Sequence, residues 1–95
     1  MLYLALEKEL KKIPASRKKS LLKQEAETVS QLHRAGIIRQ IYFSERHEAV
    51  IIFELGSLDE VNDVLASLPL VKGDYIIFEL IELHRYTGFS RLKKK

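Results

Sequence analysis

Apolar and polar residues alternate along several short stretches of the chain. In LYLALE (2–7), leucine occupies every second position, which is typical of a β-strand because successive strand side chains point to opposite faces. Apolar stretches at 37–43 and 49–54 predict two more strands, joined by a hairpin at 44–47. Residues 75–83 form the last and longest predicted strand.

Two helices are predicted between these strands. The first runs over about 16–35, and Gly36 ends it as a C-cap. The second begins at Ser57, which forms a capping box with Glu60, and it is expected to end at Pro69. Its predicted buried face consists of Leu58, Val61, Val64, Leu65 and Leu68.

The elements follow one another in the order β-α-β-β-α-β, the ferredoxin-like plan of the α+β class. Right-handed crossovers place both helices on one face of a four-stranded antiparallel sheet. We expect a single domain over residues 1–88, followed by a basic tail at 89–95 that frays in solvent.

The predicted sheet is apolar on both faces. Residues 49–53 read Ala-Val-Ile-Ile-Phe, without the alternation of a strand that has one wet face. The last strand places Tyr75, Ile77, Ile81 and Leu83 on one side and Ile76, Phe78 and Leu80 on the other. Two helices cover only one face, and burial of apolar area is worth about 25 cal/mol per Å2. We therefore expect a second copy to stack on the other face, giving at least a homodimer.

Composition narrows the class of protein. Ninety-five residues make one small domain, and 46% apolar with 31% charged residues is typical of a folded protein. The absence of cysteine excludes disulfides and thiolate metal sites and gives no sign of an oxidising compartment. No apolar run approaches the ~20 residues of a membrane span, and the charged N-terminal segment is unlike a signal peptide. These features favour a cytoplasmic protein that does not contact a membrane.

The net charge of +3 is concentrated at the C-terminal end. Four positive charges belong to SRLKKK (90–95), which leaves the rest of the chain at −1. Nucleic-acid binding needs a basic face on the folded part, preferably with aromatic side chains that stack on bases. The sequence therefore predicts a solvated tail and no nucleic-acid partner.

Glu25 stands out within the first predicted helix. At 100° per residue it falls inside an apolar stripe that includes Leu21, Val29 and Leu32. A carboxylate directed at a sheet is usually paired, hydrogen-bonded or shifted in pKa. One interpretation is a general acid or base in a cleft. The other is a structural ion pair, for example with Arg39, or a side chain that reaches solvent.

Few other residues point to a specific chemistry. His33 lies at the rim of the same stripe, but His47 and His84 fall on separate elements, so no metal site is expected. The chain has neither a GxSxG nucleophile motif nor a glycine-rich phosphate loop. We expect a small-molecule ligand, if one binds, to contact His33, Tyr42 and Leu70.

Three segments carry a resemblance to a known family. They are the opening strand MLYL, the helix–strand segment EAETVSQLHRAGIIR (25–39) and the second-helix segment SLDEVNDVLASLPL (57–70). In their order and spacing over residues 1–86, they resemble the muconolactone Δ-isomerase family of the dimeric α+β barrel group.

The resemblance implies a dimeric α+β barrel and, as in the family, further assembly into a larger oligomer. It also implies cofactor-free chemistry, in which a general base removes a proton from a lactone carbon. Glu25 matches a family glutamate and would be the catalytic acid–base residue. Arg39 would be its catalytic partner, pairing with a substrate carboxylate or a developing enolate charge.

The chain departs from the family pattern in the predicted pocket wall. It has no tryptophan, Ile38 and Tyr42 occupy the second strand, and Gln40 stands where a histidine is expected. Because fold does not determine function, we expect an isomerase-like protein of unknown substrate, acting on a small organic acid or lactone. The alternative is a non-catalytic oligomeric domain that binds a small ligand or a partner. A barrel monooxygenase is a weaker third hypothesis.

Overall fold

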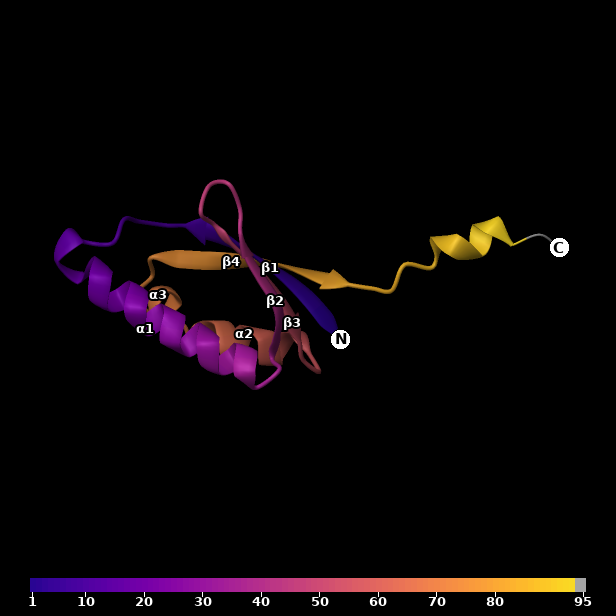
Figure 1. Ribbon diagram of the computed structural model, residues 1–95, viewed down its shortest axis with the longest axis horizontal. Coiled ribbons are helices and arrows are strands. Elements are labelled where there is room, and N and C mark those ends of the chain that lie inside the picture. Colours follow the sequence, from indigo (N-terminus) through magenta and orange to yellow (C-terminus); the bar gives the residue numbers. More distant parts are fainter. Residues whose placement is uncertain (94–95) are drawn as a thin grey trace.

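The computed structural model describes residues 1–93 (Figure 1). In chain order its elements are β1 (Leu2–Glu9), α1 (Ala15–Arg34), β2 (Ile38–Phe43), β3 (Ala49–Glu54), α2 (Leu58–Ala66), α3 (Pro69–Lys72), β4 (Ile76–Leu83) and the 3-10 helix η1 (Gly88–Leu92). The predicted β-α-β-β-α-β order is confirmed, with α3 and η1 as short additions.

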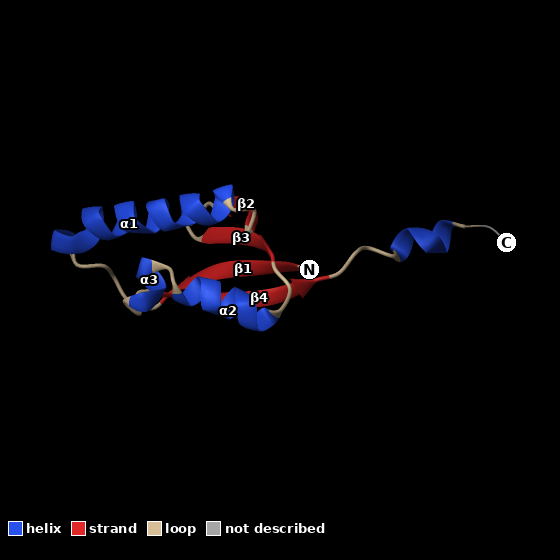
Figure 2. Cartoon of the chain, turned by 90° about the horizontal axis from the view of Figure 1, so that it is seen from below, coloured by secondary structure: helices blue, strands red, loops and turns tan. Residues whose placement is uncertain are grey.

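The four strands form one antiparallel sheet in the order β2-β3-β1-β4. In the central pair, Tyr3 lies opposite Phe53 and Ala5 lies opposite Ile51, so these four side chains share one face. The helices α1 and α2 cover that same face, as the two perpendicular views show (Figures 1 and 2). The predicted ferredoxin-like α+β fold is therefore confirmed.

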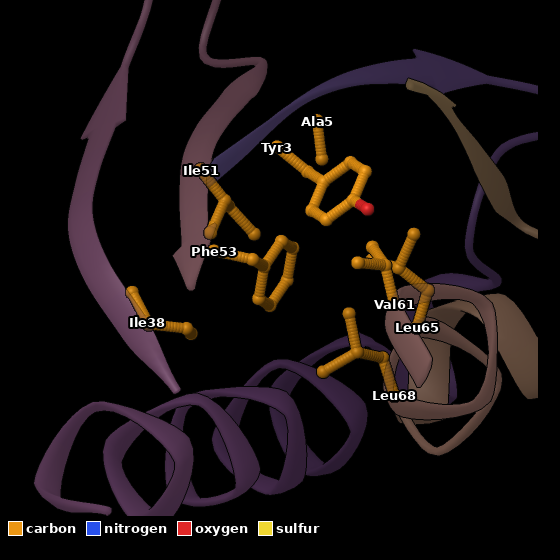
Figure 3. Close-up of a cluster of buried hydrophobic side chains, with 8 residues drawn as sticks. All are labelled: Tyr3, Ala5, Ile38, Ile51, Phe53, Val61, Leu65 and Leu68. Atoms are coloured by element: carbon orange, nitrogen blue, oxygen red, sulfur yellow. The ribbon is translucent and has the colours of Figure 1, made fainter. Parts of the chain in front are cut away.

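The main hydrophobic core lies between this face of the sheet and α2 (Figure 3). Its buried side chains are Tyr3, Ala5, Ile38, Ile51, Phe53, Val61, Leu65 and Leu68. From α1, the partly buried Val29 and Leu32 pack against this cluster. Each fully buried large side chain contributes about 1.5–3 kcal/mol, so the cluster is the principal contact between the two layers.

The end of α1 and the start of α2 are as predicted. The C-cap of α1 is Ala35, and Gly36, the predicted cap, is the next residue. Its φ of +79° is a left-handed conformation that glycine adopts without steric cost. At α2, the Ser57 hydroxyl accepts a hydrogen bond from the N–H of Glu60 at 3.2 Å. The Glu60 carboxylate in turn accepts the N–H of Gly56 at 2.9 Å. Both side chains thus satisfy main-chain donors that the helix leaves free.

The end of α2 differs from the prediction. α2 ends at Ala66, and Pro69 is the first residue of α3 instead of the stop of α2. Proline suits this position because the first turn of a helix has no intrahelical acceptor for the missing N–H. Leu58, predicted to be buried, is 48% exposed, because Val61 and Leu65 form the part of α2 that meets the core.

The sheet face opposite the helices is apolar and uncovered. On this face Leu2, Ile77 and Ile81 are 39%, 48% and 40% exposed. Between them lie the half-buried Leu4 and Ile52, which are opposite each other in the β1–β3 ladder. This is the surface on which the sequence predicts a second copy.

Beyond β4 the chain leaves the sheet, and η1 lies apart from the two layers (Figure 1). Residues 94 and 95, the end of the predicted basic tail, lie outside the described residues. Among the described helices, none is both long and apolar enough to cross a membrane.

Candidate functional site

A cleft of about 1170 Å3 opens between α1 and the sheet. Apolar side chains line it from both sides, with Leu22 and Val29 on α1 and Ile51, Ile76 and Phe78 on the strands. Its polar lining consists of Glu7, Glu9, Lys11, Lys18, Glu25, Ser30, His33, Arg46, His47 and Glu48. The cleft is an apolar slot with charged groups placed along its walls and rim.

The cleft exists because α1 packs against the rest of the molecule at two places. Near its start, Leu21 packs with Leu70 and Tyr75 in a second buried cluster. Further along, Val29 packs against the main core. Between these two contacts, Leu22, Glu25 and Ala26 line the slot.

Glu25 is half-buried, and its carboxylate is held from a second element. Its Oε1 accepts a hydrogen bond from the main-chain N–H of Leu70 at 3.0 Å. Burial is the largest influence and raises the pKa of Glu25, the Leu70 N–H opposes it, and the negative charge of Glu7 adds to the rise. Glu25 is therefore a cleft carboxyl that holds its proton more tightly than a carboxyl in water.

Glu7 is a second carboxylate in this cleft, and the sequence-based reasoning did not single it out. It is half-buried on β1, and its Oε1 accepts the main-chain N–H of Ala49 at 2.9 Å. The signal was present in the alternation of the first strand, because Glu7 follows Tyr3 and Ala5 on the face that meets the core.

The three residues predicted to contact a ligand all line the cleft: His33, Tyr42 and Leu70. Leu70 is buried at its inner end, whereas Tyr42 is 60% exposed and its hydroxyl donates to Gln40 at 3.5 Å. His33 is exposed on α1. The structure thus brings these positions to one cavity wall or rim, together with Glu25.

Arg39 lies outside the cleft that contains Glu25. It is absent from the cleft lining and forms an ion pair with Glu54, with both side chains exposed. Arg39 follows the buried Ile38 and therefore falls on the opposite side of β2, and a register shift in the β2–β3 ladder leaves it as the extra residue. Within this chain, neither an ion pair of Arg39 with Glu25 nor an anion clamp beside it is formed.

The β2–β3 hairpin supplies a cation that sequence reasoning missed. Arg46 is the one arginine among the cleft-lining residues of the described chain, and His47 lies beside it. The Ser44 hydroxyl accepts the N–H groups of Arg46 and Glu48, each at 3.2 Å, and so fixes the turn. His47 has φ +59°, uncommon for a residue other than glycine, and its ring meets Phe43 edge-on. The guanidinium of Arg46 therefore reaches the cleft from a turn that the Ser44 hydrogen bonds hold in place.

The carboxylates and histidines that the structure describes do not converge on a metal-binding geometry. Within residues 1–93, no group of three or more His, Cys, Asp or Glu side chains is placed to hold a metal ion. The charged groups that the cleft presents are the carboxyl groups of Glu25 and Glu7 and the cations of Arg46, Lys11 and Lys18.

Comparison with protein families finds one profile, described as muconolactone delta-isomerase, that matches residues 1–88. Among curated proteins, the comparison finds no match.

Two solved structures are similar in fold. The crystal structure of muconolactone isomerase has a TM-score of 0.79 at 23% sequence identity, covering 93% of each chain. The 5-chloro-2-hydroxyhydroquinone dehydrochlorinase from Burkholderia phenoliruptrix AC1100, in complex with 2,5-dihydroxybenzoquinone, has a TM-score of 0.65 at 15% identity. The match covers 93% of this chain and 98% of the dehydrochlorinase. At these identities, the two structures establish the shared fold.

Proposed function

The chain belongs to the muconolactone delta-isomerase family, and on this basis we propose that it is an isomerase-like enzyme that moves a proton within a small organic acid or lactone, without a cofactor. The observation that carries the proposal is the place of Glu25, whose half-buried carboxylate faces an apolar cleft. In such surroundings the charged form is disfavoured, which brings the pKa of a carboxyl closer to the pH at which it exchanges protons efficiently.

The reaction class needs a carboxyl group that exchanges a proton with carbon. A carboxylate removes a proton from a carbon next to a carbonyl, and the electron pair delocalises into an enolate. A carboxylic acid then returns a proton to another carbon of the conjugated system. The hydrogen bond from Leu70 supports this role for Glu25, because it orients one oxygen and leaves Oε2 without a hydrogen bond from the described residues.

The other cleft residues suit an anionic substrate of modest size. Arg46 takes the role that the sequence assigned to Arg39, since a guanidinium is suited to pair with a carboxylate. His33, Tyr42 and Leu70 contribute the remaining contacts. At about 1170 Å3 the cleft is somewhat larger than most small-molecule sites, which measure roughly 300–1,000 Å3, so a small organic acid or lactone fits inside it.

Assembly is a further part of the proposal. The uncovered sheet face exposes Leu2, Ile77 and Ile81, and a second copy stacked there removes this apolar surface from water. We therefore propose a homodimer through the sheet face as the functional unit, in line with the dimeric barrel that the sequence resemblance implies.

Binding and proton transfer are best tested on the same panel of compounds. Small carboxylates and γ-lactones, beginning with muconolactone, are screened by thermal unfolding. A ligand present at about a hundredfold excess over its Kd stabilises the protein by about 2.7 kcal/mol. Isomerisation and exchange of carbon-bound hydrogen are then followed by 1H NMR in D2O.

Glu25→Gln is the decisive variant. Glutamine keeps the size of the side chain and an acceptor for the Leu70 N–H, but it does not take up a proton. We expect ligand stabilisation to persist while proton transfer falls roughly 100- to 10,000-fold. Glu27→Gln, an exposed position on the same helix, is the matched control. Binding without proton transfer in the unmodified protein would instead identify the non-catalytic ligand-binding alternative.

A further inference from the structure

Glu7 occupies a position on the sheet where an apolar side chain is expected. It follows Tyr3 and Ala5 on the helix-facing side of β1, and both of these residues are buried in the core. Placing a carboxylate on this side costs desolvation, which an apolar residue would avoid. The Ala49 N–H, 2.9 Å from Oε1, offsets part of that cost and fixes the carboxylate in the floor of the cleft.

Glu25 reaches the same cleft from the opposite wall, on α1. The two carboxyl groups are held in the same manner, each by one main-chain N–H from a different element. Ala49 at the start of β3 donates to Glu7, and Leu70 on α3 donates to Glu25. In both groups Oε2 receives no hydrogen bond from the described residues. A flat substrate lying in the slot would therefore meet one oriented carboxyl oxygen from the sheet and one from the helix.

We propose that Glu7 is a second acid–base residue of the cleft and that it works with Glu25 across the bound substrate. This inference rests on the proposed function and divides its proton transfer between two groups. The negative charge of Glu7 contributes to the raised pKa of Glu25, as expected for two carboxyl groups that line one cleft. Two carboxyl groups that face a substrate from opposite walls are suited to opposite roles, one as base and the other as acid.

The proton balance of the shared reaction is complete. Glu7 in its carboxylate form takes a proton from a carbon next to the carbonyl, so a C–H bond breaks and an O–H bond forms on Glu7. The electron pair moves into the conjugated system as an enolate. Glu25 in its protonated form gives its proton to a different carbon, where a C–H bond forms. One proton has then passed from Glu25 to Glu7, and exchange with solvent restores the starting state without an oxidant or reductant.

Glu7→Gln separates this role from a purely structural one. The glutamine carbonyl still accepts the Ala49 N–H, so the junction of β1 and β3 is kept, but the side chain no longer takes up a proton. With muconolactone as the probe, we expect kcat to fall roughly 100-fold or more, as for Glu25→Gln, with KM changed by a small factor. Glu27→Gln again serves as control, since this exposed residue lies on the outer side of α1.

A second readout does not depend on turnover. The carboxyl 13C resonance of Glu25 is titrated in the unmodified protein and in Glu7→Gln, and we expect the apparent pKa of Glu25 to fall in the variant. An unchanged titration would overturn the pairing whatever the substrate is. If Glu7→Gln keeps the kcat of the unmodified protein while Glu25→Gln loses it, the role of Glu7 is wrong and the proposed function stands. Absence of any isomerisation or exchange by the unmodified protein would overturn the proposed function, and the role of Glu7 with it.

Discussion

The carboxylate of Glu25 on α1 accepts a hydrogen bond from the main-chain N–H of Leu70 on α3, with 3.0 Å between Oε1 and N. The two residues are 45 positions apart in sequence, so the contact ties the middle of the long helix to the segment that leads into β4. The hydrogen bond also lowers the pKa of Glu25, which burial raises, because an N–H donor stabilises the ionised carboxylate.

Replacing Glu25 by glutamine should change how stability depends on pH. Burial, the largest influence, and the charge of Glu7 raise the pKa of Glu25 above its ordinary value of 4.5 in the folded state. The folded protein therefore holds this proton more tightly than the unfolded chain does. The resulting stabilisation is present at low pH and is lost as the pH rises through the folded pKa.

Urea unfolding of both proteins between about pH 4 and 7 measures this effect. The unmodified protein should lose stability relative to Glu25→Gln as the pH rises above about 4.5, because the variant has no charge to bury. A stability difference that stays constant over this range would contradict the raised pKa.

The place of Glu25 was predictable because it depends on local geometry alone. A helix turns 100° per residue, so the position of Glu25 within its apolar stripe follows from the sequence once the helix is identified. Its hydrogen bond to Leu70 was not predictable, because it depends on how α3 begins after Pro69. The sequence placed Pro69 at the end of a helix, where the structure places it at the beginning of one.

Strand alternation and the family resemblance disagree over Arg39. The resemblance assigns Arg39 to the site, whereas its neighbour Ile38 is buried in the core, so Arg39 falls on the opposite side of β2 and pairs with Glu54. The register shift between Ile38 and Gln40 leaves no mark in the sequence that would reveal it. Arg46 was not recognised as a cleft residue because it lies in a turn whose shape depends on Ser44 and His47.

Replacing a buried and an exposed leucine near α2 by alanine tests where the hydrophobic core lies. Leu68 is fully buried between α2 and the sheet, whereas Leu58 is 48% exposed. Leu68→Ala should cost about 2–5 kcal/mol through lost burial and the cavity left behind. Leu58→Ala, the same change at the surface, should cost less than about 1 kcal/mol. Thermal unfolding reports both, with about 4–8 °C per kcal/mol expected for a domain of this size. Equal effects would contradict the layer arrangement.

Arg46→Ala should weaken the binding of carboxylate ligands. A hydrogen bond to a charged group is worth about 1.5–3 kcal/mol, so the Kd for muconolactone should rise roughly 10- to 100-fold. The methyl ester of the same compound lacks the anion and should bind both proteins similarly. Arg34→Ala removes an arginine outside the cleft and serves as control. Isothermal titration measures these constants, and a loss confined to Arg39→Ala would refute the assignment to Arg46.

A charge on the uncovered sheet face should dissociate the proposed dimer. Ile81 on this face is 40% exposed and Leu58 on α2 is 48% exposed, so the same substitution can be compared at two similarly exposed apolar positions. Ile81 lies opposite Leu4 in the β1–β4 ladder, so a stacked partner would bury Ile81→Glu against apolar side chains, at a cost of several kcal/mol per ion. Leu58→Glu leaves its charge in water. Light scattering should give the mass of a dimer or larger oligomer for the unmodified protein and for Leu58→Glu, and a smaller species for Ile81→Glu. Monomers in all three would show that the apolar face is tolerated in water, and stacking of the sheets would then have to be abandoned.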